Sequence, residues 1–590
     1  MEMQEFYEGN SFDAYTFFGA HVQENGVIFR TYAPGAEKVS LFGDFNGWQE
    51  EEMQKDGAVY SLFIPEAYPG MMYKYVIYSS SCGRVEHCDP YGFGMELRPK
   101  FASYIVNLET YCFHDEDWMS GRDKNYNRPM QIYELHLGSW KKKGEHWYQY
   151  DEIADALIWY LKENHFTHVE FLPLNEHPAD CSWGYQSTGF FSPTSRYGTA
   201  IQFMQLVDRC HQAGIGVIMD FVPVHFAMDG YGLRLYDGSP LYEYPESDVH
   251  MSEWGTYNFI HSRGEVCSFL QSAANFWLSV FHFDGLRMDA ISRAIYWQGD
   301  PKRGVNDCTV NFLKRMNYGL HKLHPTAMLI AEDSTSFLKI TAPVEYDGLG
   351  FDYKWNLGWM NDTLAYFRTP PDERPAHYNK LLFSMEYFYQ ELFLLPFSHD
   401  ENVHGKATII QKMWGDYTVK FPQCRALYLY MLAHPGKKLN FMGGEFAQFR
   451  EWDENRAQDW EILQFPLHNS FLQYIRKLNQ LYQQHPALYT GEYDPRCFSW
   501  LIADAPLQSV YVFTRKSCGE RMVCAFNFSD QIQEIEFPEN NPLYEIIASD
   551  LTEFGGARSG LEQIHPRIRN GKRTIGMILS PFSGRLFIAE

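Results

Sequence analysis

The chain has 590 residues, of which 45% are hydrophobic and 21% are charged, a composition typical of a globular protein of about three or four domains. Its formal net charge of −24 argues against nucleic acid or an anionic membrane as the main partner, so a neutral or cationic substrate fits better. Aromatic residues reach 17%; a large core accounts for most of them, and their flat faces also suit flat neutral ligands such as sugars or bases.

The N-terminal segment "MEMQEFYEGN" is acidic and contains no basic stretch followed by an apolar one, so we expect no secretory signal. No uninterrupted apolar run reaches the roughly 18 residues of a membrane-spanning helix. The 11 cysteines are scattered without a CxxC pair, which predicts reduced core thiols in a cytoplasmic protein. The sequence has no phosphate-binding loop, dinucleotide fingerprint or HExxH motif, and we expect no cofactor and no metal.

The N-terminal part of the chain alternates apolar and polar residues. Within residues 20–107, segments such as "GVIFRTYAP" and "KVSLFGDFNGW" are separated by turn residues, the pattern of a β-sandwich. The same pattern returns in residues 495–590. These patterns predict a β-sandwich at 1–112, a middle domain at 113–490 and an all-β domain at 491–590.

The middle of the chain has a different sequence pattern, in which short apolar runs alternate with longer helical stretches. The runs are 131–137, 167–174, 216–222, 282–289, 327–333, 348–355, 391–400 and 438–445. Candidate helices between them include 151–163, 200–213, 264–281, 309–323 and 421–433. Eight strand–helix units predict an α/β domain folded as a (β/α)8 TIM barrel. A doubly wound open sheet is the alternative, although it usually has fewer strands and often a glycine-rich turn after the first.

One connection in this middle zone is unusually long. After "DFVPVHF" the chain continues to about residue 262 before the next good helical pattern. Connections longer than about 15 residues are uncommon and usually functional. This one contains Trp254 and Tyr257, which we expect to contribute to a substrate-binding wall.

Polar residues follow several of the predicted barrel strands, where barrel enzymes carry their chemistry. Because these strand ends face one mouth, we expect the side chains to act together. The residues are Asp220 and His225 after the third strand, Arg287 and Asp289 at the fourth, Glu332 at the fifth, and His399 and Asp400 at the seventh.

A carboxylate cluster in an aromatic-rich protein suits glycosidic bond chemistry. One acid protonates the leaving oxygen, and an ionised carboxylate attacks or stabilises the oxocarbenium-like centre. Arg287 and Asp289 lie two residues apart, so on a strand they share one face, and the arginine favours the ionised form of Asp289. A metal-binding carboxylate cluster is the rival interpretation, but Arg287 would repel a divalent cation.

Four short motifs in this zone resemble those of the α-amylase superfamily of glycoside hydrolases and transglycosylases. They are "DFVPVH" (220–225), "DGLRMDA" (284–290), "AEDS" (331–334) and "FSHD" (397–400). The resemblance implies that Asp289 is the nucleophile and Glu332 the general acid/base, and that Asp400 binds and distorts the reacting sugar.

The same resemblance implies supporting roles for further residues. Arg287 would hold the nucleophile, His225 and His399 would contact sugar hydroxyls, and Asp220 would support the others from behind. No asparagine precedes His225 in the first motif, although many amylases use one to hold calcium, so no metal requirement is expected.

Longer segments resemble the 1,4-α-glucan branching enzymes in particular, and this resemblance covers nearly the whole chain. It includes an N-terminal domain like a family 48 carbohydrate-binding module, and it implies that Tyr185 in "WGYQ" is a sugar-stacking platform. The segments are "SWGYQSTGFFSPTSRYGT" (182–199), "WGTYNF" (254–259), "SHDENVHGK" (398–406) and "HPGKKLNFMGGEFAQFREWD" (434–453).

The implied reaction is a retaining double displacement on an α-1,4-glucan, with transfer to a 6-hydroxyl to form an α-1,6 branch. A related amylase or debranching hydrolase is the alternative; the complete set of Asp289, Glu332, Asp400 and Arg287 argues against an inactive glucan-binding scaffold. The expected partners are α-1,4-glucan polysaccharides such as glycogen, amylose or amylopectin, with no nucleic acid and no membrane. We expect a cytoplasmic monomer.

Three residues keep open interpretations at this stage. Trp48 in "GDFNGW" either stacks on a remote glucan or fills its own sandwich. His136 in "YELHLGSW" is predicted to make structural hydrogen bonds. Glu445 in "MGGEF" either lines the acceptor side or accepts hydrogen bonds from loop amides, and the sequence does not choose.

Overall fold

The computed structural model describes residues 2–569 and 571–590. The chain divides into two compact units, and each is described by itself. Unit 1 comprises Met1–Lys124, His136–Ile158 and Glu170–Asp352, and unit 2 comprises Asn125–Leu135, Trp159–Val169 and Tyr353–Glu590. Across the described ranges, no helix combines the length and the apolar character that a bilayer crossing requires.

Eight parallel strands close into a barrel, which confirms the predicted (β/α)8 fold. Each strand falls within or beside one predicted apolar run, because strands buried on both faces are apolar almost throughout; all six residues of β14 are buried. In barrel order the strands are β10 (Gln131–Leu135), β11 (His168–Phe171), β14 (Gly216–Phe221), β17 (Gly285–Met288), β18 (Met328–Ala331), β19 (Tyr353–Trp355), β20 (Phe393–Phe397) and β21 (Lys437–Phe441).

The helices that alternate with these strands agree with the predicted segments. They are α4 (Tyr150–Glu163), α5 (Ala200–Gln212), α6 (Gly264–Val280), α8 (Asp307–Leu323) and α12 (Tyr417–Ala433). The start of α5 is fixed by a capping box, in which Thr199 Oγ1 accepts from the amide of Gln202 and the Gln202 side chain accepts from the amide of Thr199. Helix α12 begins four residues before its predicted start because Asp416 caps it.

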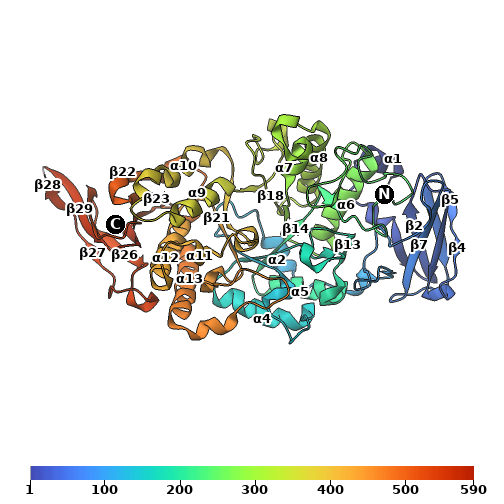
Figure 1. Cartoon of the computed structure of the whole chain (residues 1–590), viewed down its shortest axis with the longest axis horizontal. Coiled ribbons are helices and arrows are strands. Elements are labelled where there is room, and N and C mark those ends of the chain that lie inside the picture. Colours follow the sequence, from blue (N-terminus) through green and yellow to red (C-terminus); the bar gives the residue numbers. More distant parts are fainter. Residues whose placement is uncertain (1, 570) are drawn as a thin grey trace. The chain divides into compact units, whose positions relative to one another are not determined.

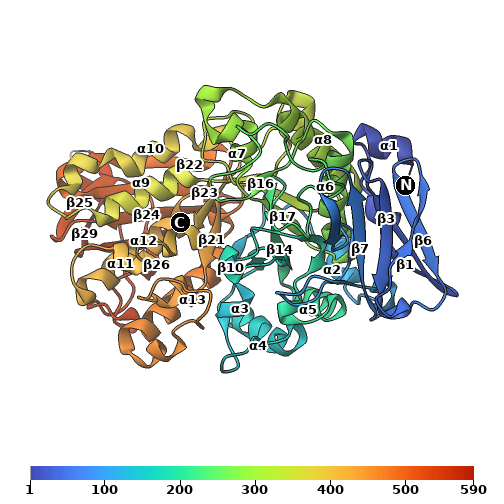
Figure 2. The same ribbon diagram turned by 45° about the vertical axis from the view of Figure 1, so that its right-hand side comes forward.

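The N-terminal part of unit 1 is a pair of antiparallel sheets, as the alternating pattern predicted (Figures 1 and 2). One sheet has the order β1-β2-β6-β5, and the other β4-β3-β7-β8 with β9 beside β7. Aromatic rings fill the space between them; the rings of Phe29 and Tyr73 lie 4.9 Å apart, edge to face. The strands are β1 (Gly19–Gln23), β2 (Gly26–Tyr32), β3 (Lys38–Gly43), β4 (Glu51–Glu52), β5 (Gln54–Asp56), β6 (Val59–Ile64), β7 (Met72–Ser79), β8 (Gly83–His87) and β9 (Ser103–Tyr104).

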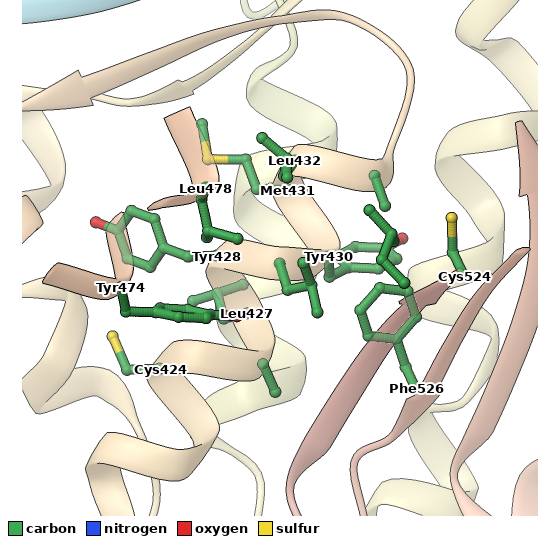
Figure 3. Packing of buried hydrophobic residues seen from close by; sticks show 14 of the residues in the cluster. Cys424, Leu427, Tyr428, Tyr430, Met431, Leu432, Tyr474, Leu478, Cys524 and Phe526 are labelled. Atoms are coloured by element: carbon green, nitrogen blue, oxygen red, sulfur yellow. The ribbon is translucent and has the colours of Figure 1, made fainter. Parts of the chain in front are cut away.

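The C-terminal part of unit 2 is also all-β, drawn in red in Figure 1. A six-stranded sheet has the order β22-β23-β24-β30-β26-β27, and a three-stranded sheet has the order β25-β29-β28. In chain order these strands are β22 (Phe498–Ala505), β23 (Val510–Ser517), β24 (Glu520–Asn527), β25 (Gln533–Pro538), β26 (Leu543–Ala548), β27 (Gln563–Ile564), β28 (Arg567–Arg569), β29 (Lys572–Leu579) and β30 (Ser583–Ala589). Helix α12 packs against both this domain and α13 (Pro466–Gln484), and Figure 3 shows its side chains between them. The Tyr430 ring of α12 meets the Phe526 ring of β24 (Glu520–Asn527) edge to face at 5.6 Å.

The prediction of core thiols is wrong for about half of the cysteines. All 11 are free. Five are buried, but five are exposed and one is intermediate, because several lie on short loops where neighbouring apolar residues do not cover them. The buried ones are Cys88, Cys210, Cys267, Cys424 and Cys524.

Two local features place side chains above the barrel strands. The long connection contains no helix between residues 227 and 263, and it is held by pairing of β15 (His225–Phe226) with β16 (Tyr257–Asn258). A second small ladder joins β12 (Asn175–Glu176) to β13 (Gly189–Pro193), and the segment between them carries Tyr185.

Candidate active site

Arg287 on β17 gathers the carboxylates of unit 1. Its Nη1 donates to Asp220 Oδ2 at 2.7 Å and to Asp289 Oδ1 at 3.0 Å. Its Nη2 lies 2.9 Å from Glu332 Oε2. These three carboxylates come from the ends of three neighbouring strands, β14, β17 and β18, whose registers pair Asp220 with Arg287 and Arg287 with Ile330. The structure thus brings together four of the residues predicted from the sequence.

The charge of Arg287 is secured by its surroundings. The side chain is fully buried, and burial alone disfavours a cation. The carboxylates of Asp220, Glu332 and Asp289 overcome this effect and raise the pKa of Arg287 well above its ordinary value. A permanently charged, fully desolvated guanidinium is the group expected to hold several carboxylates in fixed positions.

Burial differs among the carboxylates and divides them into two kinds. Asp220 is fully buried, whereas the side chains of Asp289 and Glu332 keep 14% and 17% of their surface exposed. The backbone fixes both exposed acids, since the amide of Asp289 donates to Phe221 O and the amide of Glu332 donates to Met288 O. In addition, the amide of Ala290, a residue in the left-handed conformation, donates to Glu332 Oε2 at 2.9 Å. Asp289 and Glu332 are therefore the two groups positioned to meet a substrate.

Tyr185 reaches the same group from the loop between β12 and β13. Its hydroxyl donates to Asp220 Oδ2 and accepts from Arg287 Nη1 at 3.3 Å. The ring is half-buried. Anchoring the hydroxyl in this way leaves the ring face as the part of Tyr185 that a sugar could contact.

His225 and Trp254 form a second pair in unit 1. Their ring centroids lie 5.3 Å apart, His225 is buried, and Trp254 keeps 47% of its surface exposed. Burial, with the nearby Arg293 cation, lowers the pKa of His225 to about 3, so the imidazole is neutral near pH 7. Its Nδ1 has no hydrogen-bond partner among the residues that the structure describes. A neutral imidazole with an unused ring nitrogen is suited to a hydroxyl group.

His399 and Asp400 lie just after the end of β20 in unit 2, and a residue that the sequence did not single out orients the ring of His399. Glu134 on β10 is fully buried and accepts from His399 Nδ1 at 2.6 Å and from the His399 amide at 2.9 Å. His399 Nε2 lies 3.6 Å from Asp400 Oδ1, and the Asp400 side chain is 47% exposed. The signal for Glu134 was present, because it is a charged residue inside the apolar run "QIYELHL".

The ring of Tyr257 packs outside this group. Its ring packs against Phe226 and His250, and the guanidinium of Arg234 lies 5.3 Å from its centroid. Tyr257 alternates with Asn258 along β16, and it is Asn258 that pairs with His225. The structure therefore joins Trp254, but not Tyr257, to His225.

The structure describes the surroundings of Trp48 and His136, whose roles the sequence left open. Trp48 is 38% exposed, with its Nε1 donating to Asp44 Oδ1 at 2.9 Å, so it does not fill the sandwich. The His136 side chain shares a 2.8 Å hydrogen bond with Ser139, as predicted for a structural residue.

Glu445 has a structural environment. It is fully buried and accepts from the hydroxyls of Tyr133 at 2.9 Å and Tyr160 at 2.6 Å. Burial raises its pKa, while these hydrogen bonds act in the opposite direction. Glu445 therefore ties β10, α4 and the end of β21 together rather than lining a binding surface.

A barrel with paired carboxylates at its strand ends and all-β domains at both ends of the chain defines an enzyme of the α-amylase class. Three family models match: carbohydrate-binding module 48 (isoamylase N-terminal domain) at residues 17–92, the alpha amylase catalytic domain at 141–232, and the alpha amylase C-terminal all-beta domain at 500–583. Among the residues described, no group of three or more His, Cys, Asp or Glu side chains is arranged to hold a metal ion.

Solved structures agree on the fold. A pullulanase from Anoxybacillus sp. LM18-11 complexed with maltotetraose has a TM-score of 0.77 at 14% identity, covering 99% of this chain and 89% of that one. The GBS pullulanase SAP in complex with maltotetraose has a TM-score of 0.76 at 14% identity, covering 97% and 88%.

Similarity of sequence defines the family more closely. The 1,4-alpha-glucan branching enzyme GlgB of Bacillus caldolyticus is 44% identical, over 99% of this chain and 89% of the relative. GlgB of Bacillus subtilis (strain 168) is 43% identical, over 94% and 91%. The chain belongs to the family of 1,4-alpha-glucan branching enzymes.

Proposed function

We propose that the protein cleaves an α-1,4 bond of a glucan and transfers the released chain to a 6-hydroxyl, which forms an α-1,6 branch. The observation that carries this proposal is the arrangement around Arg287. Two partly exposed acids, Asp289 and Glu332, contact this one buried guanidinium, and the chain is a member of the branching-enzyme family. The partners that follow are α-1,4-glucans such as glycogen, amylose or amylopectin.

In the first half of the reaction, Asp289 Oδ attacks the anomeric carbon while Glu332 gives its proton to the glycosidic oxygen. The carbon–oxygen bond breaks, its electron pair stays with the leaving oxygen, and a glycosyl ester forms on Asp289. This step removes the negative charge of Asp289. Asp220 remains beside Arg287 at 2.7 Å, so the buried cation keeps a partner throughout.

In the second half, Glu332 accepts the proton of the acceptor's 6-hydroxyl, and the oxygen displaces Asp289 from the anomeric carbon. Two inversions give net retention. If water were the acceptor the result would be hydrolysis, so transfer depends on binding a glucan acceptor at high effective concentration. Tyr185, Trp254 and Tyr257 are proposed to contact the glucan.

The remaining assignments concern the reacting sugar. We infer that Asp400 binds and distorts this sugar, and that His225 and His399 contact its hydroxyls. The neutral state of His225 and the fixed ring of His399, which Glu134 orients, support these roles. Side chains alone supply the chemistry in this proposal, and the protein acts as a cytoplasmic monomer.

The test uses amylose and follows iodine colour and reducing ends together. Branching shortens the linear segments that bind iodine, so the colour falls while almost no reducing ends appear. A parallel rise in reducing ends would instead establish the hydrolase alternative. The same assay on D289A and E332Q checks the catalytic assignment, since near-normal transfer by either variant would overturn it.

A further inference from the structure

Arg293 lies four residues after Asp289, on the short helix α7 (Ile291–Ile295). Its side chain is nearly buried, although it carries a charge that the reaction does not use. Its Nε donates to Glu253 Oε2 at 2.6 Å, and its Nη2 donates to Gln298 Oε1. The guanidinium also lies 5.9 Å from the centroid of the Trp254 ring. One side chain therefore contacts two neighbouring residues of the loop that carries Trp254.

Gln298 extends this contact to the backbone of the same loop. Its Nε2 donates to the carbonyl oxygens of Asp248 at 2.9 Å and Met251 at 3.0 Å. Gln298 has a φ of 58°, an uncommon conformation for a residue other than glycine, and this turn aims its side chain at the loop. Arg293 and Gln298 together contact four residues of the segment 248–254, which are Asp248, Met251, Glu253 and Trp254.

The other end of the loop is held independently of Arg293. Asn258 pairs with His225 in the β15–β16 ladder, and Met251 bridges to Tyr257. Between these fixed points Trp254 lies at the tip, 47% exposed, with its ring beside His225. Holding the loop on both sides restricts the orientations that this exposed ring can take.

We propose that Arg293 is a positioning residue that, with Glu253 and Gln298, fixes Trp254 for contact with the glucan and so sets the affinity for it. The inference rests on the proposed function, in which Trp254 contacts the substrate. Because Arg293 is on the helix that follows the nucleophile, it links the position of the binding surface to that of Asp289. Nearby Arg293 also contributes to keeping His225 neutral.

The first test compares R293M with R293K. In R293M the loop must be ordered when substrate binds, and ordering a side chain costs about 0.5–1.5 kcal/mol, so the KM for amylose should rise about 2- to 13-fold with kcat within about twofold. R293K should be intermediate, because an ammonium cannot reach Glu253 and Gln298 with the planar fork of a guanidinium.

R303M is the matched control. Arg303 contacts the same loop through an ion pair of 3.0 Å with Asp248, but the two side chains keep 38% and 70% of their surface exposed. Exposed pairs contribute little, so its KM should change less than twofold. E253Q is a second variant for the case in which R293M folds poorly. It removes the same ion pair by changing Glu253, whose side chain is 56% exposed and so does not belong to the core. An unchanged KM in E253Q and R293M would overturn the proposal.

A double-mutant cycle identifies Trp254 as the intermediary. W254A should raise the KM, and adding R293M to W254A should change it little further. Additive effects, or a raised KM in W254A with none in R293M, would show that Arg293 does not act through Trp254. An unchanged KM in W254A would contradict the substrate contact of Trp254 itself, and with it the inference, while transfer by Asp289 and Glu332 would stand.

Discussion

At the scale of single residues, Arg287 decides how the candidate site works. One guanidinium contacts three carboxylates, so the group carries two surplus negative charges when all three acids are ionised and one when a single acid holds a proton. That surplus of negative charge is what a reaction with one proton donor and one nucleophile requires. Asp220, the fully buried member, would keep the guanidinium paired in the proposed step in which Asp289 forms an ester.

R287K tests this account. Lysine keeps the charge but replaces the planar fork with a single point, so Asp289 loses its alignment, and kcat should fall about 100-fold. Because a cation remains near Asp220, the free energy of unfolding should fall by less than the roughly 3–5 kcal/mol that is lost when a buried ion pair is broken outright. Branching rates and denaturant unfolding measure the two effects, and near-normal kcat would contradict the role given to Arg287.

Glu134 offers a second prediction at this scale. In E134Q the side chain can no longer accept from both His399 Nδ1 and the His399 amide, so kcat/KM should fall about 10- to 100-fold, as expected for losing a charged hydrogen bond of about 1.5–3 kcal/mol. E445Q is the control, since Glu445 is equally buried in unit 2 but accepts from tyrosine hydroxyls. Equal losses in the two variants would show that Glu134 has only a structural role.

At the scale of elements, a buried ion-pair cluster around His211 connects the segment 115–121 to a barrel strand within unit 1. His211 on α5 contacts Asp115 through Nδ1 at 2.7 Å and Asp284, which precedes β17, through Nε2 at 3.0 Å. Trp118 of α2 (Glu116–Gly121) donates to Asp284 and stacks on His211. Burial opposes a charge on His211, but the two carboxylates raise its pKa to about 9. The segment is thereby held at the amino-terminal end of a barrel strand.

The ion-pair cluster around His211 predicts that stability depends on pH. The pKa of His211 is about 9 in the fold against about 6.5 unfolded, so its stabilisation is complete below pH 6.5 and is lost as the pH rises through 9. The free energy of unfolding should fall by about 3 kcal/mol over that range because of this group. H211Q should remove most of this slope, and parallel pH profiles for the two proteins would contradict the assignment.

The elements also show how far a sequence alone can reach. Eight buried strands were predictable because burial on both faces leaves an apolar run, and Asp289 and Glu332 because they end such runs. Glu134 stood out as a charged residue in an apolar run, but its contact was not predictable, because its partner His399 is 265 residues away in the chain. The exposed cysteines and the exposed Trp48 were likewise not predictable, since hydropathy does not show which side of a turn a side chain takes.

At the scale of the whole molecule, the charge is relevant to the kind of substrate. The net charge of −24 would repel an anionic polymer, whereas a glucan carries no charge. Recognition then depends on aromatic faces and hydrogen bonds, such as those available at Tyr185 and His225, and not on ion pairs.

Salt dependence checks this property. For a neutral polymer no counterions are released on binding, so the KM for amylose should change less than about twofold between 50 and 300 mM NaCl. A KM that rises steeply and log-linearly with salt would show that charged groups carry recognition.

The most direct test of the central claim traps the ester on Asp289. An α-maltosyl fluoride needs no proton from Glu332 to lose its leaving group, so E332Q should still complete the first step but lack the base for the second. Mass spectrometry of the digested variant should then find one maltosyl group on the peptide that contains Asp289. A label on another residue, or no label while fluoride is released, would contradict a double displacement through Asp289.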